Sequence, residues 1–259
     1  MTSATVKRRG DPWIVRPRPN PAATIRLFCF PYAGLGTSVF RNWPPIFPPH
    51  VEVVLVQPPG REARWGEQAF RQAGDLAASA TQALLPLLTM PFMFFGHSLG
   101  AMTGFEVIRQ LRRGGHPQPL RLFASALRAP QLPYPHPLLH RLPDAEFIDR
   151  VCDQYGGIPQ ALLDNPDLLK LVLPCLRADF TVFETYRYVD EAPLACPITA
   201  FGGTRDRRIT EREIGEWRHQ TTEDFRYEMF DGDHFFLKNG RDQLLASVMR
   251  DLNAAGLAK

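Results

Sequence analysis

The most informative stretch of the chain is Pro91-Phe92-Met93-Phe94-Phe95-Gly96-His97-Ser98-Leu99-Gly100, in which an apolar run leads into a serine between two glycines. A helical pattern follows over residues 101–113. Such glycines permit a sharp turn in which the serine holds strained backbone angles without collisions between neighbouring Cβ atoms. The turn would expose the Ser98 hydroxyl above a sheet, at a helix N-terminus that favours a developing oxyanion. Composition alone would produce only about 0.03 matches to Gly-x-Ser-x-Gly in this chain, so an ordinary glycine-flanked turn is disfavoured.

Other short apolar runs predict further strands, and longer patterns between them predict helices. Most runs are apolar at consecutive positions, which is typical of strands covered on both faces of a parallel sheet and not of an antiparallel sandwich. We therefore expect an α/β fold with a mostly parallel central sheet flanked by helices. The expected strands are Ile25–Phe30, Val51–Val56, Phe92–Phe95, Leu120–Ala126, Ile198–Phe201 and Phe225–Phe230, and the expected helices are Glu67–Leu88, Leu99–Arg113, Glu211–His219 and Arg241–Asn253.

One interval is too long for a single crossover helix, because about 70 residues separate Ala126 from Ile198. Within it, 144–155 and 165–186 show helical spacing, and Pro174 is expected to kink or divide the second helix. We expect a single domain over residues 25–259 that carries a helical lid insertion at about 135–190, with a small packing subdomain as the alternative. Residues 1–24 are expected to be an extended N-terminal lead-in, so that the fold starts after them.

Composition limits the class of protein. Of the 259 residues, 44% are apolar and 22% are charged, as in an ordinary soluble globular protein. The net charge of +3 is spread along the chain, which disfavours a nucleic-acid partner. No run has the length of a membrane span or the form of a secretory signal, so we expect a cytoplasmic protein without a membrane partner. We also expect a monomer. The cysteines are expected to be free thiols, and no metal is expected, because wide spacing separates Cys29, Cys152, Cys175 and Cys196.

A serine nucleophile needs a neutral imidazole to take its proton and a carboxylate to orient that imidazole. Gly-x-Ser-x-Gly indicates the α/β-hydrolase fold, in which the three residues follow the chain order serine, acid, histidine. That order leaves His219 and His234. His219 lies within an expected helix, whereas His234 lies in the loop after the strand 225–230, where this fold displays catalytic groups. We therefore expect His234 to act as general base and acid.

The acid is expected to be Asp206, which ends the loop after the strand 198–201 and so lies at the same sheet edge as the serine and the histidine. Three other aspartates were possible. Asp190 is better explained as a turn residue, Asp233 is adjacent to the histidine and poorly placed to accept from its ring, and Asp231 is its close neighbour.

Two backbone N–H groups would complete an oxyanion hole. One comes from Leu99, which follows the nucleophile, and we choose Ala33 in the loop after the first strand for the other. The same loop is not a dinucleotide-binding fingerprint. Val39 replaces the third glycine of that pattern, and Gln57 stands where an acidic residue would be needed. We expect no cofactor.

Several segments together resemble the type II thioesterases of polyketide and non-ribosomal peptide biosynthesis. The Pro-Tyr-Ala-Gly, Pro-Gly-Arg-Glu and Arg-Ala-Asp-Phe elements are much narrower signals than Gly-x-Ser-x-Gly. The resemblance runs from about residue 25 to 252 and implies the same roles for Ser98, Asp206, His234, Ala33 and Leu99. Asp231 departs from it, because members commonly have glycine there. The matching segments are Phe28-Cys29-Phe30-Pro31-Tyr32-Ala33-Gly34, Gln57-Pro58-Pro59-Gly60-Arg61-Glu62, Gly96-His97-Ser98-Leu99-Gly100, Leu176-Arg177-Ala178-Asp179-Phe180, Glu184-Thr185-Tyr186 and Gly232-Asp233-His234-Phe235.

The resemblance also implies a substrate, an acyl group held as a thioester on the phosphopantetheine arm of an acyl or peptidyl carrier protein. The implied role is removal of stalled or aberrant acyl units from the assembly line, although some members release a product instead. Two other functions stay open. A general carboxylesterase or lipase would prefer oxygen esters, and a non-catalytic carrier-binding module would need none of the serine, aspartate and histidine set.

Overall fold

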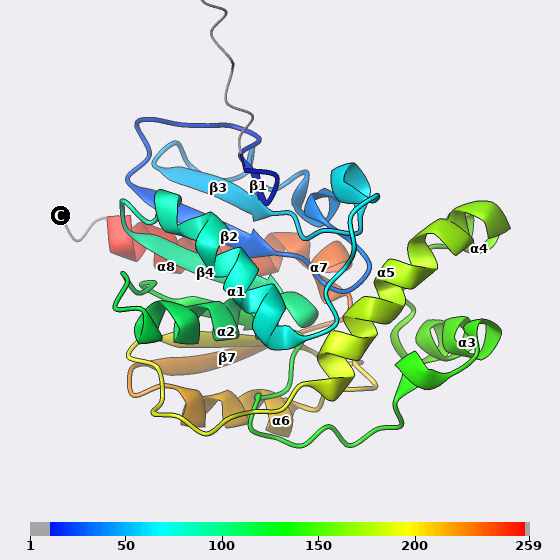
Figure 1. Cartoon of the computed structure of the whole chain (residues 1–259). Helices are drawn as coiled ribbons and strands as arrows, with labels where there is room; N and C mark the ends of the chain where they lie inside the picture. Colours follow the sequence, from blue (N-terminus) through cyan, green and yellow to red (C-terminus); the bar gives the residue numbers. More distant parts are fainter. Residues whose placement is uncertain (1–10, 257–259) are drawn as a thin grey trace, which may run out of the picture.

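A seven-stranded, mostly parallel sheet forms the centre of the computed structural model, which describes residues 11–256 (Figure 1). The strand order is β1-β3-β2-β4-β5-β6-β7, and only the edge strand β1 runs antiparallel to its neighbour. This confirms the expected sheet and all six expected strands, with ends shifted by a few residues. The strands are β1 Ile14–Val15, β2 Ile25–Phe30, β3 Val51–Val56, β4 Phe92–His97, β5 Leu122–Ser125, β6 Ile198–Gly203 and β7 Phe225–Phe230.

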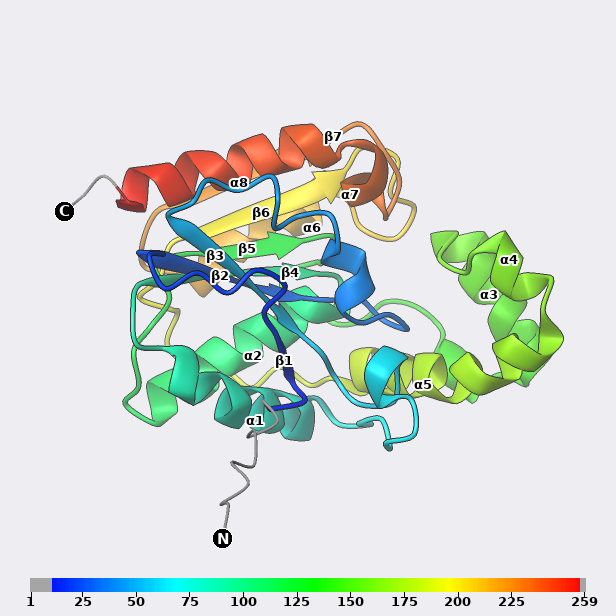
Figure 2. The same ribbon diagram turned by 90° about the horizontal axis from the view of Figure 1, so that it is seen from above.

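Helices cover both faces of the sheet, as Figure 2 shows from above. The apolar side chains of α1 (Ala73–Leu84), α2 (Leu99–Arg113) and α6 (Glu211–Gly215) belong to one core, and those of α8 (Arg241–Gly256) belong to a second core on the other face. Strands β2 to β6 are buried at every residue. This two-sided burial explains why they are apolar at consecutive positions. Short helical segments complete the fold: Thr37–Phe40, Glu62–Arg64, Leu85–Leu87, Leu139–Arg141, Glu216–Gln220 and α7 Phe236–Asn239.

Register aligns the carboxyl ends of the central strands. Phe30 of β2 pairs with Gly96 of β4, and Ser125 of β5 pairs with both His97 of β4 and Phe201 of β6. The loops that follow these strands therefore emerge along one edge of the sheet, which is where open α/β sheets bind ligands.

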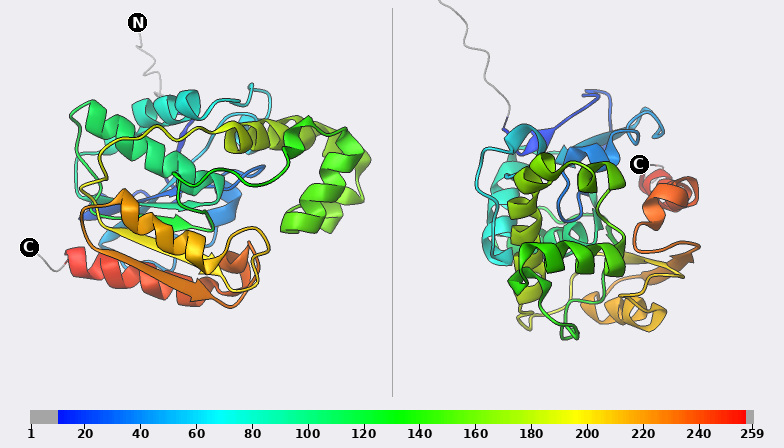
Figure 3. Two further views of the ribbon diagram at one scale, coloured as in Figure 1. Left: turned by 90° about the horizontal axis from the view of Figure 1, so that it is seen from below. Right: turned by 90° about the vertical axis from the view of Figure 1, so that its right-hand side faces the viewer.

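Three helices, α3 (Asp144–Tyr155), α4 (Gln160–Leu163) and α5 (Pro166–Thr185), lie between β5 and β6 in the sequence. Figures 2 and 3 place them beyond the carboxyl edge of the sheet. They share a small apolar cluster that includes Phe147 and Phe180. α5 is one helix through Pro174, so the proline does not divide it. The short helix α4 was not predicted.

The N-terminal segment corrects one expectation. Trp13 is buried in the same core as the apolar side chains of α1 and α2, where its ring contacts Phe70 and lies under the guanidinium of Arg64. β1 then pairs with the end of β3. The fold therefore begins before residue 25, because an edge strand and a large apolar side chain anchor this segment. The expected helix 67–88 is also shorter, since residues 67–72 are not helical and Pro86 lies in a tighter final turn.

Candidate active site

Ser98 occupies the turn between β4 and α2 with backbone angles φ +54° and ψ −119°. A residue with a Cβ rarely adopts such a conformation, and its cost is borne by the surrounding structure. A Cβ added at Gly96 would overlap the backbone of Gly100, and one added at Gly100 would overlap the carbonyl oxygen of Phe30. Glycine is therefore sterically required at both positions, as the sequence predicted.

Ser98, His234 and Asp206 form a continuous hydrogen-bonded triad. The Oγ of Ser98 lies 3.1 Å from Nε2 of His234, and Nδ1 of that ring lies 2.8 Å from Oδ2 of Asp206. The histidine and aspartate side chains are buried. Because a carboxylate only accepts hydrogen bonds, Nδ1–H donates to Asp206 and leaves Nε2 of the neutral ring to accept from the serine hydroxyl. The second carboxylate oxygen, Oδ1, accepts from the backbone N–H of Arg208 at 2.8 Å, which fixes the plane of the carboxylate.

The other candidates for the acid and the base that the sequence offered lie outside this triad. Asp231 is exposed and pairs with Arg205. Asp233 accepts the backbone N–H of Phe235 in a local turn, at 2.8 Å. Asp190 is exposed, and His219 lies 3.4 Å from Glu216 on the same helical turn.

His97 has a structural task that the sequence did not reveal. Burial lowers the pKa of this imidazole well below its ordinary value, and the neighbouring His234 lowers it further. The ring is therefore neutral. Its Nε2 lies 2.9 Å from the carbonyl oxygen of His234 and must donate, so Nδ1 accepts from the hydroxyl of Ser125 at 2.9 Å. His97 thus holds the backbone of His234. The two-residue period of β4 was the available signal, because it directs His97 to the face opposite Phe94.

The two expected oxyanion donors line the same pocket as Ser98 and His234. Leu99 is the first residue of α2, where a backbone N–H has no acceptor within the helix. Ala33 lies in the loop after β2. Within residues 11–256, neither N–H donates to another group of the chain.

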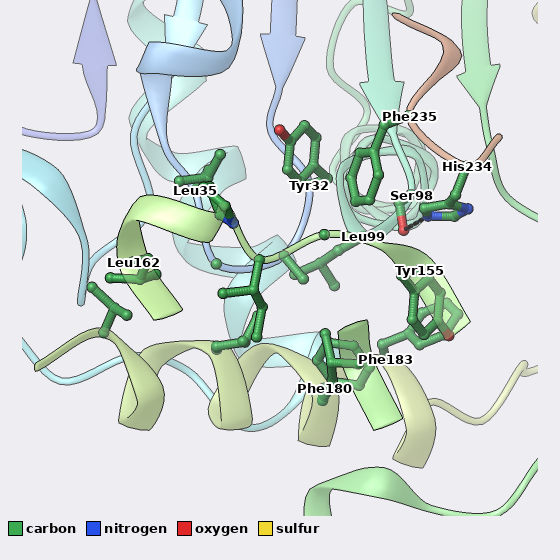
Figure 4. Close-up of a pocket in the computed structure, with 18 residues that line it drawn as sticks. Tyr32, Leu35, Ser98, Leu99, Tyr155, Leu162, Phe180, Phe183, His234 and Phe235 are labelled. Atoms are coloured by element: carbon green, nitrogen blue, oxygen red, sulfur yellow. Dashed lines mark hydrogen bonds between the residues drawn. The ribbon is translucent and has the colours of Figure 1, made fainter. Parts of the chain in front are cut away.

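An apolar pocket opens at Ser98 and runs between the inserted helices and the loop after β2 (Figure 4). Ser98 and His234 lie at one end of it, and Leu35 and Leu162 lie at the other. Its wall is almost wholly apolar. The inserted helices contribute Val151, Tyr155, Leu162, Val172, Leu176, Phe180 and Phe183. An extended aliphatic group would fit this elongated shape.

Two further findings concern the described residues 11–256. They contain no group of three or more histidine, cysteine, aspartate or glutamate side chains placed to hold a metal ion. None of their helices is both long enough and apolar enough to cross a bilayer.

The four cysteines are free thiols, and burial raises the pKa of Cys175 and of Cys196 to about 12.

A parallel sheet with a strained serine at a strand-to-helix turn, and an aspartate and a histidine after later strands, defines an α/β-hydrolase. Comparison with known proteins narrows the class. A family described as "Thioesterase domain" matches residues 25–255, and the chain belongs to it.

Individual relatives match over nearly their whole length. Gramicidin S biosynthesis protein GrsT of Aneurinibacillus migulanus is 39% identical over 240 residues, which cover 93% of each chain. Among solved structures, RedJ, a thioesterase from the prodiginine biosynthetic pathway of Streptomyces coelicolor, is 37% identical with a TM-score of 0.84 and covers 96% of each chain. YbtT, a type II thioesterase from the yersiniabactin NRPS/PKS biosynthetic pathway, is 31% identical with a TM-score of 0.82 and covers 92% of this chain and 97% of its own.

Proposed function

We propose that this thioesterase hydrolyses acyl groups from the phosphopantetheine arm of carrier proteins and so removes stalled or aberrant units from a polyketide or non-ribosomal peptide assembly line. The observation that carries the proposal is a Ser98–His234–Asp206 triad that opens into an elongated apolar pocket. Relatives named for gramicidin S, prodiginine and yersiniabactin biosynthesis support this setting.

The proposed reaction starts when Nε2 of His234 takes the proton of Ser98 as Oγ bonds to the thioester carbonyl carbon. The carbonyl oxygen becomes an oxyanion, which the N–H groups of Ala33 and Leu99 would stabilise. Collapse of this intermediate breaks the carbon–sulfur bond. The imidazolium gives its proton to the departing thiolate, and the acyl group stays on Ser98 as an ester. Asp206 stabilises the imidazolium throughout.

Water completes the cycle by the same route. Nε2 of His234 takes a proton from water, and the resulting oxygen nucleophile attacks the ester carbonyl. Breakdown returns the proton to Oγ of Ser98 and releases a carboxylic acid. Every step uses groups of this chain, the substrate and water, so the proposal includes no cofactor. It places the enzyme in the cytoplasm as a monomer, beside the carrier proteins that it serves.

The test is intact-protein mass spectrometry of an acylated carrier protein incubated with the enzyme. Ser98→Ala is the control, and a small oxygen ester is offered separately. We expect rapid loss of the acyl mass from the carrier, no loss with Ser98→Ala, and slower cleavage of the oxygen ester. Retention of the acyl mass together with brisk cleavage of the oxygen ester would contradict the proposal and indicate a general esterase.

An acylated carrier that bears a short, aberrant acyl unit and one that bears the finished product distinguish editing from product release. We expect the enzyme to clear a short, aberrant acyl unit at least as fast as the finished chain, because an editing enzyme must accept many acyl groups. Strong preference for the finished chain would assign the product-releasing role instead.

A further inference from the structure

The loop of residues 31–38 after β2 is held from outside by polar side chains of the segment that follows β3. The carboxylate of Glu62 accepts the N–H of Gly36 at 3.0 Å and that of Ser38 at 3.2 Å. The amide oxygen of Gln57 accepts the N–H of Thr37 at 3.1 Å. Glu62 itself has φ +47°, a conformation that costs energy for a residue with a side chain. The segment after β3 is therefore built to fix this loop.

The inserted helix α5 holds the same loop at a second point. Oδ2 of Asp179 accepts the N–H of Gly34 at 2.7 Å. Arg61 donates to both oxygens of that carboxylate, at 2.5 and 2.9 Å, and also to the carbonyl of Pro59. One turn earlier, Leu176 packs against Gly34 so closely that a Cβ there would lie 2.8 Å from its Cδ1.

Gly34 is the residue directly after the expected oxyanion donor. The peptide N–H groups of Ala33 and Gly34 flank one Cα atom, so fixing the second restricts the directions available to the first. Gly34 has φ +82°, which turns the chain sharply at this point and would strain any other residue. The hydrogen bond to Asp179 thus helps to fix the shape of the loop next to Ala33, the expected oxyanion donor.

The Arg61–Asp179 pair is almost fully buried, with 6% and 2% of the residue surfaces exposed. Burial alone would lower the pKa of the Arg61 guanidinium, but the neighbouring Asp179 raises it, so the guanidinium stays charged. Apolar residues of similar volume often stabilise a protein as well as a buried ion pair does. A gain in stability therefore does not by itself explain why the Arg61–Asp179 pair lies beside the active site.

We propose that Asp179 is a positioning residue for the oxyanion hole, held in place by Arg61, so that the inserted helix α5 is part of the support of the catalytic loop. This inference rests on the proposed function, because it takes Ala33 as an oxyanion donor. It assigns a shared task to the Pro-Gly-Arg-Glu and Arg-Ala-Asp-Phe segments, which lie 118 positions apart at Arg61 and Asp179.

The test replaces the pair by apolar residues in Arg61→Met/Asp179→Leu, which leaves no unpaired charge. The readout is the rate of covalent labelling of Ser98 by a phosphonate, whose phosphoryl oxygen must enter the oxyanion hole. We expect labelling to slow by about 100-fold, the cost of a misplacement near 1 Å. For a small acyl thioester, kcat should fall by a similar factor while KM stays within about threefold.

The matched control is Arg26→Met/Glu52→Leu, which removes another buried ion pair (2.8 Å) at the opposite end of β2 and β3. It should label at the wild-type rate. Asp179→Asn keeps an acceptor for Gly34 and should recover part of the rate. Asp179→Ala removes the acceptor and replaces the double variant if that variant does not fold. Circular dichroism and thermal unfolding confirm that each variant is folded.

Wild-type labelling rates in a folded variant that lacks the Asp179 acceptor would overturn the inference and leave the proposed function intact. Equal slowing in the Arg26/Glu52 control would also overturn it, since the effect would then follow from lost stability. Failure of the wild type to be labelled at Ser98 would overturn the proposed function and, with it, this inference.

Discussion

Two imidazoles with different tasks lie side by side at the candidate site, with ring centroids 5.6 Å apart. His234 exchanges hydrogen bonds with side chains that take part in the proposed reaction. His97 lies on the face of β4 opposite Phe94, donates a hydrogen bond to the backbone carbonyl of His234 and stays neutral. The backbone position of the first is therefore held by a hydrogen bond from the second.

Substitutions in the triad should be strongly non-additive. Ser98→Ala is expected to lower the rate of the chemical step by about 10⁶-fold, His234→Ala by about as much, and Asp206→Asn by somewhat less, because the three residues act as a unit. Single-turnover loss of the acyl mass from a carrier protein measures each rate. Asp233→Asn is the control, since Asp233 only accepts a local backbone N–H. Full activity in Asp206→Asn would show that another carboxylate orients His234.

Neutral His97 should make the fold sensitive to acid. Its pKa is lowered in the folded protein by burial, whereas an unfolded histidine has a pKa of about 6.5. Below that pH the unfolded chain binds a proton that the folded chain does not, so stability is full above about pH 7 and falls as the pH drops. This one group contributes up to about 1.4 kcal/mol per pH unit.

Urea unfolding between pH 5 and pH 7 measures this effect. We expect His97→Gln, which can still donate to His234 and accept from Ser125, to reduce the pH dependence of the free energy of unfolding by about one proton. His219→Gln, at an exposed position, should keep the wild-type slope. An unchanged slope in His97→Gln would show that the buried ring is not the source of acid sensitivity.

Chain order and strand ends were enough to select Ser98, Asp206 and His234 from the sequence, because each follows a recognisable strand. Pairing between distant motifs was not predictable. Arg61 and Asp179 were both in segments singled out by the resemblance, but only folding brings them together on Gly34. Sequence periodicity shows which face a side chain occupies and does not show its partner across the molecule.

At the scale of elements, α5 illustrates what a sequence pattern can and cannot predict. Its N-terminus is capped by Asn165, whose side chain accepts the N–H of Leu168 at 3.1 Å, and its apolar spacing was evident. Near the other end, buried Glu184 accepts the N–H groups of Leu139 and His140, at 2.8 and 2.9 Å. These contacts tie α5 to the connection after β5, and no local pattern indicated them. The helix α4 has only four residues, too few for a periodic signal.

The inserted helices should set the acyl chain length that the enzyme accepts. Leu162 of α4 lines the pocket at the end away from Ser98 (Figure 4), so Leu162→Trp should shorten the pocket. We expect kcat/KM to fall for long acyl thioesters and to change little for short ones. If a few methylene groups lose their contacts, the ratio of kcat/KM for long over short substrates should fall by about 10-fold.

A ladder of acyl thioesters of increasing chain length measures this preference. Leu171→Trp is the matched control, because Leu171 is an exposed leucine on α5 and does not line the pocket. An unchanged chain-length profile in Leu162→Trp would contradict the assignment of this pocket to the acyl group. A uniform loss at every length would show instead that the helix had been displaced.

At the scale of the whole molecule, the strand order explains how residues far apart in the sequence share one site. The loops after the parallel strands β2, β4 and β6 emerge at the same carboxyl edge of the sheet. The loop after the edge strand β7 returns toward Ser98 and places His234 within hydrogen-bond distance of it. The sequence predicted this parallel arrangement from buried apolar runs. It did not predict β1, because two residues within a proline-rich stretch carry no strand pattern of their own. Pairing with β3 supplies the structure that local propensity lacks.

The segment before β2 should therefore contribute to stability. Trp13 is 8% exposed and contacts Phe70 and Arg64, whereas Trp65 is 71% exposed. We expect Trp13→Ala to lower the free energy of unfolding by about 3–5 kcal/mol, through lost apolar contacts and a residual cavity. Trp65→Ala should change it by less than about 0.5 kcal/mol. Urea unfolding of both variants compares the same substitution at a buried and an exposed tryptophan. Equal, small effects would mean that the fold begins at β2 after all, and a large effect confined to Trp13 would make residues 13–15 part of the domain.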